Sequence, residues 1–201
     1  GFSGLYLINF GDTAVIKYFM TTEDVAICNV AFKLFNAVAG FSFVISSYYA
    51  GSVAQYFADA DSKKIRQFFY RERLIIFGLS TIAHVVVMVF SKPIITTLYG
   101  GDYNQSVSIF NILMIGSIFK FWGIFNMLYY NTNNRHMLNQ TLNIFSAVIN
   151  VVFNIVLVPL HGLQGAAIAT VIASMATTII SSAYCEKRIF LLSKVGSIAS
   201  K

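Results

Sequence analysis

The chain has 201 residues, of which 57% are hydrophobic and only 11% are charged, and its formal net charge is +6. Soluble domains carry about 25% charged residues, so this composition excludes an ordinary soluble domain and indicates a membrane protein. The chain starts at Gly1 inside an apolar run without the features of a signal peptide, and we expect it to be part of a longer polypeptide. Cys28 and Cys185 lack metal-ligand spacing and are expected to be small packing residues rather than a disulfide.

Six apolar stretches are each about as long as a bilayer-crossing helix, which needs roughly 20 residues. They are continuously apolar and lack the alternation of barrel strands, so helices are predicted. The predicted spans are residues 5–20, 25–57, 74–99, 106–130, 137–158 and 165–184. The expected fold class is all-α, a polytopic transmembrane helix bundle of about six spans.

Short segments between these spans carry turn signals. Residues 21–24 read Thr-Thr-Glu-Asp, which resembles a helix N-cap, and residues 99–102 contain a glycine pair. Residues 159–162 are expected to end the fifth span, because Pro159 lacks a backbone donor and disfavours helix in the residue before it.

The cations indicate which loops face the cytoplasm, because cytoplasmic loops collect Lys and Arg. Ten of the 14 cations fall on one side of the predicted bundle: Lys63, Lys64, Arg66, Arg71, Arg73, Arg135, Lys187, Arg188, Lys194 and Lys201. The opposite loops hold Glu23, Asp24, Lys92 and Asp102. We therefore place the basic loops, both termini and a short tail from about residue 185 in the cytoplasm. Topology explains most of the positive charge, so no nucleic-acid partner is expected.

The basic segment of residues 58–73 also contains Ile65, Phe68 and Phe69. An amphipathic segment along the inner membrane interface would explain this pattern. A solvated basic loop would explain it equally well.

Four charged residues remain inside the predicted spans: Asp12, Lys17, Lys33 and Lys120. A charge at the bilayer centre costs about 2.5–3.5 kcal/mol on insertion scales, so such residues usually face a protein interior or a wet cavity. Lys17 is expected to reach the outer interface by snorkelling. Asp12 is expected to be a counter-ion to a lysine or a protonatable ion-coupling group.

Lys33 shares one helix face with small and polar residues at helical spacing. These residues are Asn29, Asn36, Gly40 and Ser47. We expect this face to be wet or paired. Lys120 lies mid-span between Gly116 and Gly123, which leave room for a ligand or a neighbouring helix.

The fifth span carries a polar stripe at helical spacing, formed by Asn139, Asn143, Ser146, Asn150 and Asn154. Interhelical hydrogen bonding and the lining of a cavity are equal alternatives for this stripe. The small residues that follow Gly165 in the sixth span predict close helix packing. His84 is expected to be a packed polar residue rather than a proton relay.

The charges within the spans favour an anionic ligand, since three lysines stand against one aspartate. An ionised pyrophosphate cannot cross hydrocarbon without partners, and lysines in a closed cavity would replace its water. The candidate substrate-binding residues are Lys33, Lys120, Asn29 and Asn36, and Asp12 is the candidate for ion coupling. No metal site or cofactor is expected, because no His, Asp or Glu cluster has ligand spacing.

Two segments carry a family resemblance. Residues 98–103 read Leu-Tyr-Gly-Gly-Asp-Tyr before an apolar run. Residues 149–159 contain two asparagines and end in proline, and they precede Gly162 and the sequence Gly-Ala-Ala-Ile-Ala-Thr at residues 165–170. These segments resemble the polysaccharide and O-antigen flippases of the multidrug/oligosaccharidyl-lipid/polysaccharide exporter superfamily. The regions around Asp12 and residues 25–34 are similar to the start of the family's second lobe, so the resemblance covers nearly the whole chain.

The resemblance implies that residues 1–201 form the C-terminal six-helix lobe of a two-lobe transporter with alternating access. It implies, as cargo, an undecaprenyl-pyrophosphate-linked oligosaccharide for surface polysaccharide synthesis, translocated across the bacterial inner membrane through a cationic cavity. The expected partners are this lipid-linked oligosaccharide, membrane lipids, the missing N-terminal lobe and polysaccharide-assembly proteins. Lys33 and Lys120 are candidates by depth and face, since neither matches a binding motif of the family.

Two other classes of protein remain as alternatives. A membrane-embedded polysaccharide polymerase or ligase would need catalytic groups at one membrane face, whereas the outer loops offer only a few acidic residues and His161, so no enzyme is predicted. In a structural membrane subunit, Lys33 and Lys120 would be paired or snorkelled, with no cavity between the helices.

Overall fold

Helix α2 (Thr22–Ala58) begins at the predicted capping sequence. The computed structural model describes residues 16–199, and side chains as far as Ile189. Thr21 Oγ1 accepts a hydrogen bond from the Asp24 amide at 3.2 Å, and the Asp24 carboxylate accepts one from the Thr21 amide at 3.1 Å. This reciprocal capping box satisfies donors at the start of the helix, so the predicted N-cap is confirmed. Asp12 and most of the first predicted span lie outside the described residues.

The basic segment after α2 is helical. Helix α3 (Ser62–Gln67) passes through a π-helical turn, η1 (Phe68–Glu72), into α4 (Arg73–Val89). Ile65, Phe68 and Phe69 are buried, whereas the four cations from Lys63 to Arg71 are exposed. The segment is therefore amphipathic, as one of the two alternatives predicted, but its apolar face packs on the bundle instead of entering lipid.

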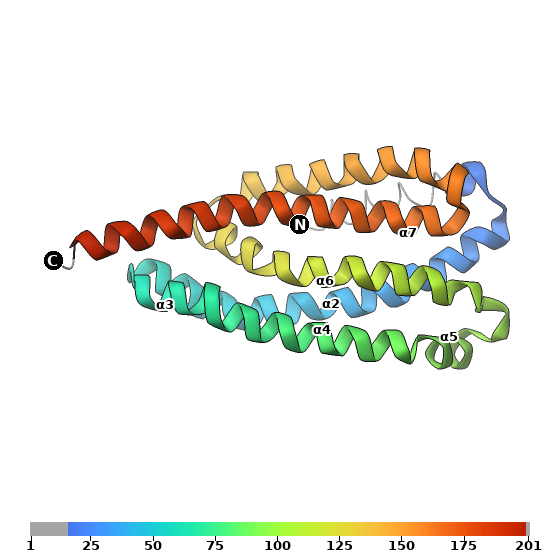
Figure 1. Ribbon diagram of the computed structural model, residues 1–201, viewed down its shortest axis with the longest axis horizontal. Helices are drawn as coiled ribbons and strands as arrows, with labels where there is room; N and C mark the ends of the chain where they lie inside the picture. The colour runs from blue at the N-terminus through green and yellow to red at the C-terminus, as the bar shows by residue number, and fades with distance from the viewer. Residues whose placement is uncertain (1–15, 200–201) are drawn as a thin grey trace.

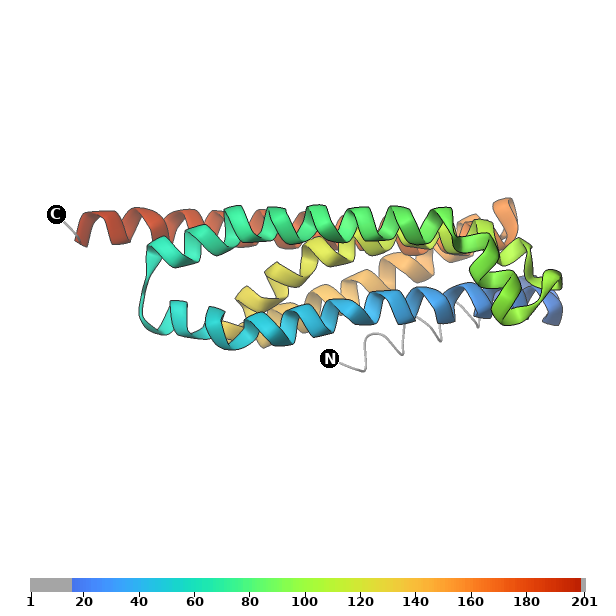
Figure 2. The ribbon, with the colours of Figure 1, turned by 90° about the horizontal axis from the view of Figure 1, so that it is seen from below.

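The third predicted span, residues 74–99, is wrong at its C-terminal end. Helix α4 stops at Val89, and a separate helix, α5 (Ser91–Tyr99), turns across the end of the bundle (Figure 2). The break has a local cause, because the ring of Pro93 clashes with the carbonyl of the residue four positions earlier, which is Val89. The glycine pair then reverses the chain as predicted. Gly100 has a φ of 97° and precedes the short helix η2 (Gly101–Tyr103).

Helix α6 (Gln105–Thr132) is the central helix and packs against α2, α4, α5 and α7 (Figure 1). Helix α7 (His136–Ala199) contains two arms that meet at Gly162, whose φ of 59° and ψ of −139° are not helical. We call residues 136–161 the first arm and residues 163–199 the second arm. The predicted reversal at residues 159–162 is confirmed, although Gly162 makes it and Pro159 remains helical.

Four helical segments of the described residues are long and apolar enough to cross a membrane: Thr22–Ala58, Ser62–Val89, Gln105–Thr132 and His136–Ile189. Because the last segment contains two arms, these helices account for five of the six predicted spans. The remaining span is the one at residues 5–20. The predicted all-α polytopic bundle is confirmed.

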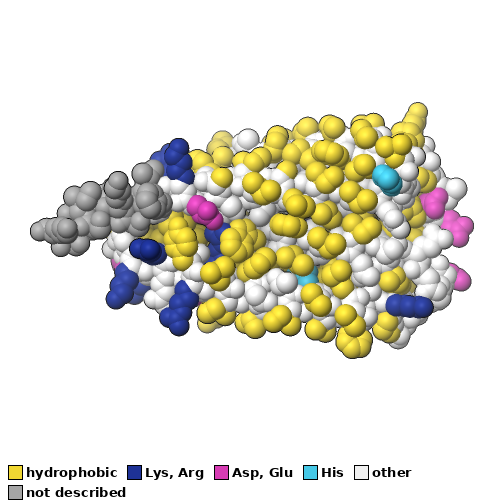
Figure 3. Space-filling view, viewed as in Figure 1, with side chains coloured by type: hydrophobic (Ala, Val, Ile, Leu, Met, Phe, Trp, Pro, Cys, Tyr) yellow, Lys and Arg dark blue, Asp and Glu magenta, His cyan; other side chains and the backbone are white. Residues whose placement is uncertain are grey.

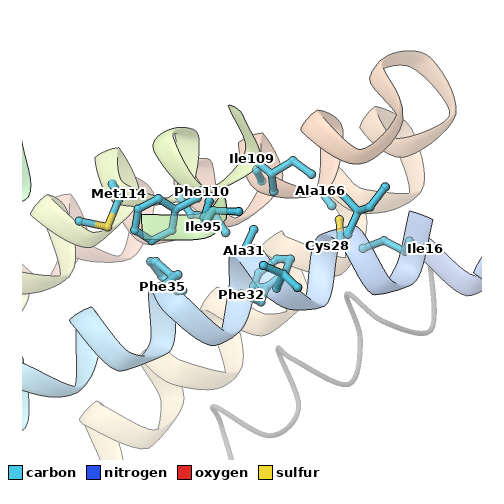
Figure 4. Close-up of a cluster of buried hydrophobic side chains, with 14 of the residues drawn as sticks. Ile16, Cys28, Ala31, Phe32, Phe35, Ile95, Ile109, Phe110, Met114 and Ala166 are labelled. Carbon is cyan, nitrogen blue, oxygen red and sulfur yellow. The ribbon is translucent and has the colours of Figure 1, made fainter. Parts of the chain in front are cut away.

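The core consists of two buried clusters. In the first cluster, Phe35 and Ala31 of α2 meet Phe110 and Met114 of α6, with Ile95 of α5 alongside (Figure 4). The second cluster lies at the α3 end of the bundle and joins α3, η1, α6 and the second arm. Cys28 belongs to the first cluster and Cys185 to the second, and both are buried and form no disulfide within the described residues, as expected for packing residues.

Large apolar side chains also cover the outside of the bundle (Figure 3). Examples on α4 and the two arms of α7 are Leu79, Ile82, Val152 and Ile179. Soluble monomers rarely expose contiguous apolar surface on this scale, whereas a spanning helix presents such a surface to lipid. The chain is a multi-pass membrane protein.

Candidate functional site

The polar face of α2 lies away from the contact between α2 and α6. We use this name for Asn29, Lys33, Asn36, Gly40 and Ser47. Lys33 and Ser47 are exposed and the other three are half-buried, whereas Ala31 and Phe35 on the opposite side are buried in the first cluster. A cation exposed on a membrane-spanning helix requires water, a headgroup or another protein surface as its neighbour.

Lys120 occupies a different environment on α6. It is half-buried, and its ammonium nitrogen lies 4.6 Å from the centroid of the Phe35 ring on α2. A cation over an aromatic face gains about 0.5–2 kcal/mol, more when water is excluded. Lys120 therefore contributes to the contact between α2 and α6, in addition to any role with a ligand.

The two candidate lysines lie at similar depths but do not share a face. At about 1.5 Å of rise per residue, Lys33 is about 16 Å from the start of α2 and Lys120 about 22 Å from the start of α6. Both helices start at the same end of the bundle (Figure 1). Lys33 and Phe35, the residue that Lys120 contacts, are two positions apart on α2, so their side chains leave the helix about 160° apart. Asn29 and Asn36 accompany Lys33 and not Lys120.

The asparagine stripe of the first arm divides into two parts. Asn150 and Asn154 are buried: Asn150 donates to Thr170 Oγ1 of the second arm at 3.1 Å, and Asn154 donates to Asn150 Oδ1 at 3.0 Å. Asn139 and Asn143, nearer the start of the arm, are only half-buried. For Asn150 the interhelical alternative holds, because its amide joins the two arms of α7, and Asn154 supports it from within the first arm.

His84 is held between α4 and α6. One ring nitrogen, Nδ1, lies 2.7 Å from the Ser80 carbonyl oxygen, and Nε2 lies 2.9 Å from Ser117 Oγ. The ring also packs edge-on against Phe121, with 4.8 Å between centroids. Both nitrogens thus have local partners, which agrees with the predicted packing role.

Arg73 was grouped by sequence with the exposed cytoplasmic cations, yet it is buried. Its guanidinium carbon lies 3.5 Å from the centroid of the Trp122 ring on α6. Its Nη2 donates to Glu186 Oε1 of the second arm at 3.3 Å. The contact joins three helices. A usable sequence signal was present, since Glu186 is the single acidic residue after position 185 in an otherwise basic segment.

Near Arg73, a network of hydrogen bonds connects the second arm to α6. The Asn126 amide donates to Ser181 Oγ at 2.8 Å and to Ser182 Oγ at 2.9 Å, and Trp122 Nε1 donates to Ser182 at 3.0 Å. Spacing within one helix cannot reveal such a network, because its members come from two helices.

Charge is separated along the bundle (Figure 3). The end formed by α3 and the second arm carries most of the cations, and the acidic residues Glu23, Asp24 and Asp102 lie at the other end. This separation matches the predicted grouping of loops. Among the described residues, no group of three or more His, Cys, Asp and Glu side chains could hold a metal ion.

No family model matches the chain, but individual proteins do. It is 26% identical over 165 residues to a capsular polysaccharide biosynthesis protein, CapF, of Staphylococcus aureus, covering 78% of this chain and 41% of that protein. It is 22% identical over 196 residues to a probable low-salt glycan biosynthesis flippase, Agl15, of Haloferax volcanii, covering 96% of this chain and 42% of that protein. The chain thus spans about two fifths of the length of these relatives.

Solved structures share the fold. A MATE protein in complex with MaD3S superposes with a TM-score of 0.84 at 16% identity, covering 95% of this chain and 43% of that one. A MOP superfamily transporter from Pyrococcus furiosus superposes with a TM-score of 0.78 at 15% identity, covering 90% and 41%. The similarity is to transporters rather than to enzymes. The expected resemblance is therefore confirmed: the chain is similar to membrane proteins of polysaccharide and glycan biosynthesis and has the fold of half of a MATE/MOP superfamily transporter.

Proposed function

We propose that residues 1–201 form the C-terminal lobe of a flippase that moves a lipid-linked oligosaccharide across a membrane for surface polysaccharide synthesis. The relatives named for capsular polysaccharide biosynthesis and glycan flipping support this role. The lobe works with a preceding N-terminal lobe, since the chain covers about two fifths of each relative. We assign the cargo to undecaprenyl-pyrophosphate-linked oligosaccharides and the location to the bacterial inner membrane.

The observation that carries the proposal is the polar face of α2. Its lysine remains exposed at membrane depth, although a charge there costs about 2.5–3.5 kcal/mol. A wet cavity between two lobes would lower this cost, and a pyrophosphate entering the cavity would find a charge-assisted donor in Lys33 and amide donors in Asn29 and Asn36.

Alternating access supplies the path in this proposal. The two lobes enclose the headgroup and open to one side of the membrane at a time, so that the pyrophosphate keeps polar partners throughout. Asp12 is our candidate for coupling this cycle to an ion. The basic end of the bundle faces the cytoplasm, as the excess of Lys and Arg in its loops favours.

A comparison of Lys120 with Lys33 distinguishes a transporter from a structural subunit. The contact of Lys120 with Phe35 suits helix packing, whereas Lys33 has an exposed side chain. Removing the Lys120 ammonium should therefore lower both stability and transport. Removing the Lys33 ammonium should lower transport alone.

The experiment is translocation of labelled undecaprenyl-pyrophosphate oligosaccharide by the full-length parent protein in vesicles. Lys33→Ala should slow transport about 10- to 100-fold, the value of one hydrogen bond to a charged group, and Lys33→Arg should restore most of it. The matched control is Lys92→Ala, an exposed lysine on α5, which should transport normally.

Normal transport by both Lys33→Ala and Lys120→Ala would contradict the cationic cavity and favour structural roles for both lysines. A well-folded wild-type protein that moves no lipid-linked oligosaccharide would contradict the flippase itself.

A further inference from the structure

A group of exposed cations surrounds the α3 end of the bundle. We call Lys63, Lys64, Arg66, Arg71, Lys187 and Arg188 the basic collar; all six are exposed. Two ion pairs are present within the described residues. Lys64 of the collar pairs with Asp61 at 3.4 Å, and the buried Arg73, which is not part of the collar, pairs with Glu186. The other members of the collar form no salt bridge in the described part of the chain.

The collar is held on a folded surface. Ile65, Phe68 and Phe69 bury the inner side of α3 and η1 in the second cluster, which also contains Cys185 and Ile189 of the second arm. Helix α3 packs against α7, so cations from two distant parts of the sequence gather at one end (Figures 1 and 3). The backbone that carries these cations is already ordered, so binding an anion has to order only their side chains.

The net charge of this end is positive. Eight described cations, the collar with Arg73 and Arg135, stand against the four acidic residues Asp59, Asp61, Glu72 and Glu186, a surplus of four. At the other end, Lys17 and Lys92 stand against Glu23, Asp24 and Asp102, a deficit of one. An anion is therefore attracted to the collar end only.

The surface beside the collar changes abruptly from charged to apolar. Directly after Arg71, the side chains of Leu74, Ile75 and Leu79 are exposed on α4, and Tyr70 is exposed at the boundary. A tyrosine between cations and an apolar helix face is typical of the level of lipid headgroups. A nucleic acid or an acidic protein would engage the cations but offer no acyl chain to the apolar face.

We propose that the basic collar binds the phosphate groups of anionic phospholipids, whose acyl chains lie along the exposed apolar face of α4. This site is separate from the polar face of α2, and it does not depend on the flippase function. The lipid is a structural partner of the lobe here, not its cargo.

The test uses the full-length parent protein in nanodiscs containing phosphatidylglycerol or phosphatidylcholine, with retained lipid counted by native mass spectrometry. Arg66→Gln combined with Arg71→Gln should weaken phosphatidylglycerol binding at least tenfold, because each cation near an anionic surface contributes about fivefold. The control that removes two exposed cations from the other end, Lys17→Gln with Lys92→Gln, should bind as the wild type does. Arg66→Lys with Arg71→Lys keeps both charges and should retain binding.

Several results would overturn the proposal. Equal retention of the two lipids by the wild type, or an undiminished preference in the Arg66→Gln/Arg71→Gln variant, would exclude an anionic lipid site. Inorganic pyrophosphate lacks acyl chains and should displace the lipid poorly. Efficient displacement would show that the apolar face of α4 does not contribute to binding. If a short oligonucleotide displaced bound phosphatidylglycerol and bound more tightly than the lipid, the collar would be assigned to nucleic acid. A wild-type protein that prefers phosphatidylglycerol but moves no lipid-linked oligosaccharide would contradict the proposed function and leave this inference intact.

Discussion

Alanine at Gly165 should destabilise the lobe because the backbone of the first arm of α7 lies directly against this glycine. A Cβ atom on Gly165 would meet the carbonyl group of Leu157 and the backbone nitrogen of Val158. These are backbone atoms of the first arm, which cannot rotate away as a flexible side chain can. The arms would have to separate near Gly162, and the hydrogen bond between Asn150 and Thr170 would lengthen.

The expected size follows from two opposing terms. Overpacking a core costs about 1–3 kcal/mol, and a clash with backbone belongs at the upper end of that range. Alanine recovers up to about 1 kcal/mol in helix propensity. The net loss for Gly165→Ala is therefore about 2 kcal/mol. At Gly78, where an added Cβ would meet nothing within 4 Å, only the gain remains.

Alanine variants at two further glycines should have stabilities between those of Gly165→Ala and Gly78→Ala. At Gly116 an added Cβ would lie 3.3 Å from the Val171 Cα, so the loss and the gain should nearly cancel. At Gly123 it would lie 3.5 Å from Thr178 Oγ1, an ordinary contact. Stability of the four alanine variants should be measured on the full-length protein by denaturant titration in detergent. The reasoning is refuted if Gly165→Ala is as stable as Gly78→Ala.

Two other perturbations test the buried polar groups and the caps. Asn150→Ala should cost about 1–2 kcal/mol in the same titration, because it removes the donor to Thr170 and the acceptor for Asn154; an equal cost for Asn143→Ala, at a half-buried position of the same arm, would contradict this. The Lys64 amide donates to Asp61 and holds the pKa of that carboxyl below its usual 3.8, so the cap of α3 is formed above that pH and is lost as pH falls through the lowered pKa. Hydrogen exchange at Lys64, corrected for intrinsic rates, should accelerate below about pH 4 in the wild type. Asp61→Asn keeps an acceptor without a titrating proton and should not show the acceleration, so identical pH profiles would count against the cap.

The spans could be predicted because hydropathy is a property of each segment alone. The start of α2 could be predicted for the same reason, because Thr21 and Asp24, the residues that cap the helix, lie three positions apart in the sequence. The break at Phe90 was missed, although its cause lies in the sequence. Pro93 lies within an apolar run whose length suits a single span, and length alone does not show that the proline ring obstructs the carbonyl of Val89.

The candidate site was predicted less completely, because side-chain partners come from other helices. Lys33 and its asparagines share a face that helical spacing alone could define. Lys120 was predicted to be near a ligand or a helix, but nothing in α6 indicates that its neighbour is Phe35. Arg73 was misassigned for the same reason, since Trp122 and Glu186 are far along the chain.

The position of Arg73 also bears on how the lobe is assembled during synthesis. Arg73 and Glu186 are 113 residues apart, and the acidic partner lies on the second arm of α7, which is made after α4. At about 5–20 residues per second, roughly 6–23 s pass between the synthesis of the two residues. During that interval α4 holds a cation whose carboxylate does not yet exist, so its basic end must remain at the aqueous surface. Docking of the second arm then permits Arg73 to be enclosed, so the contact that joins α4, α6 and α7 forms only after the second arm has been made.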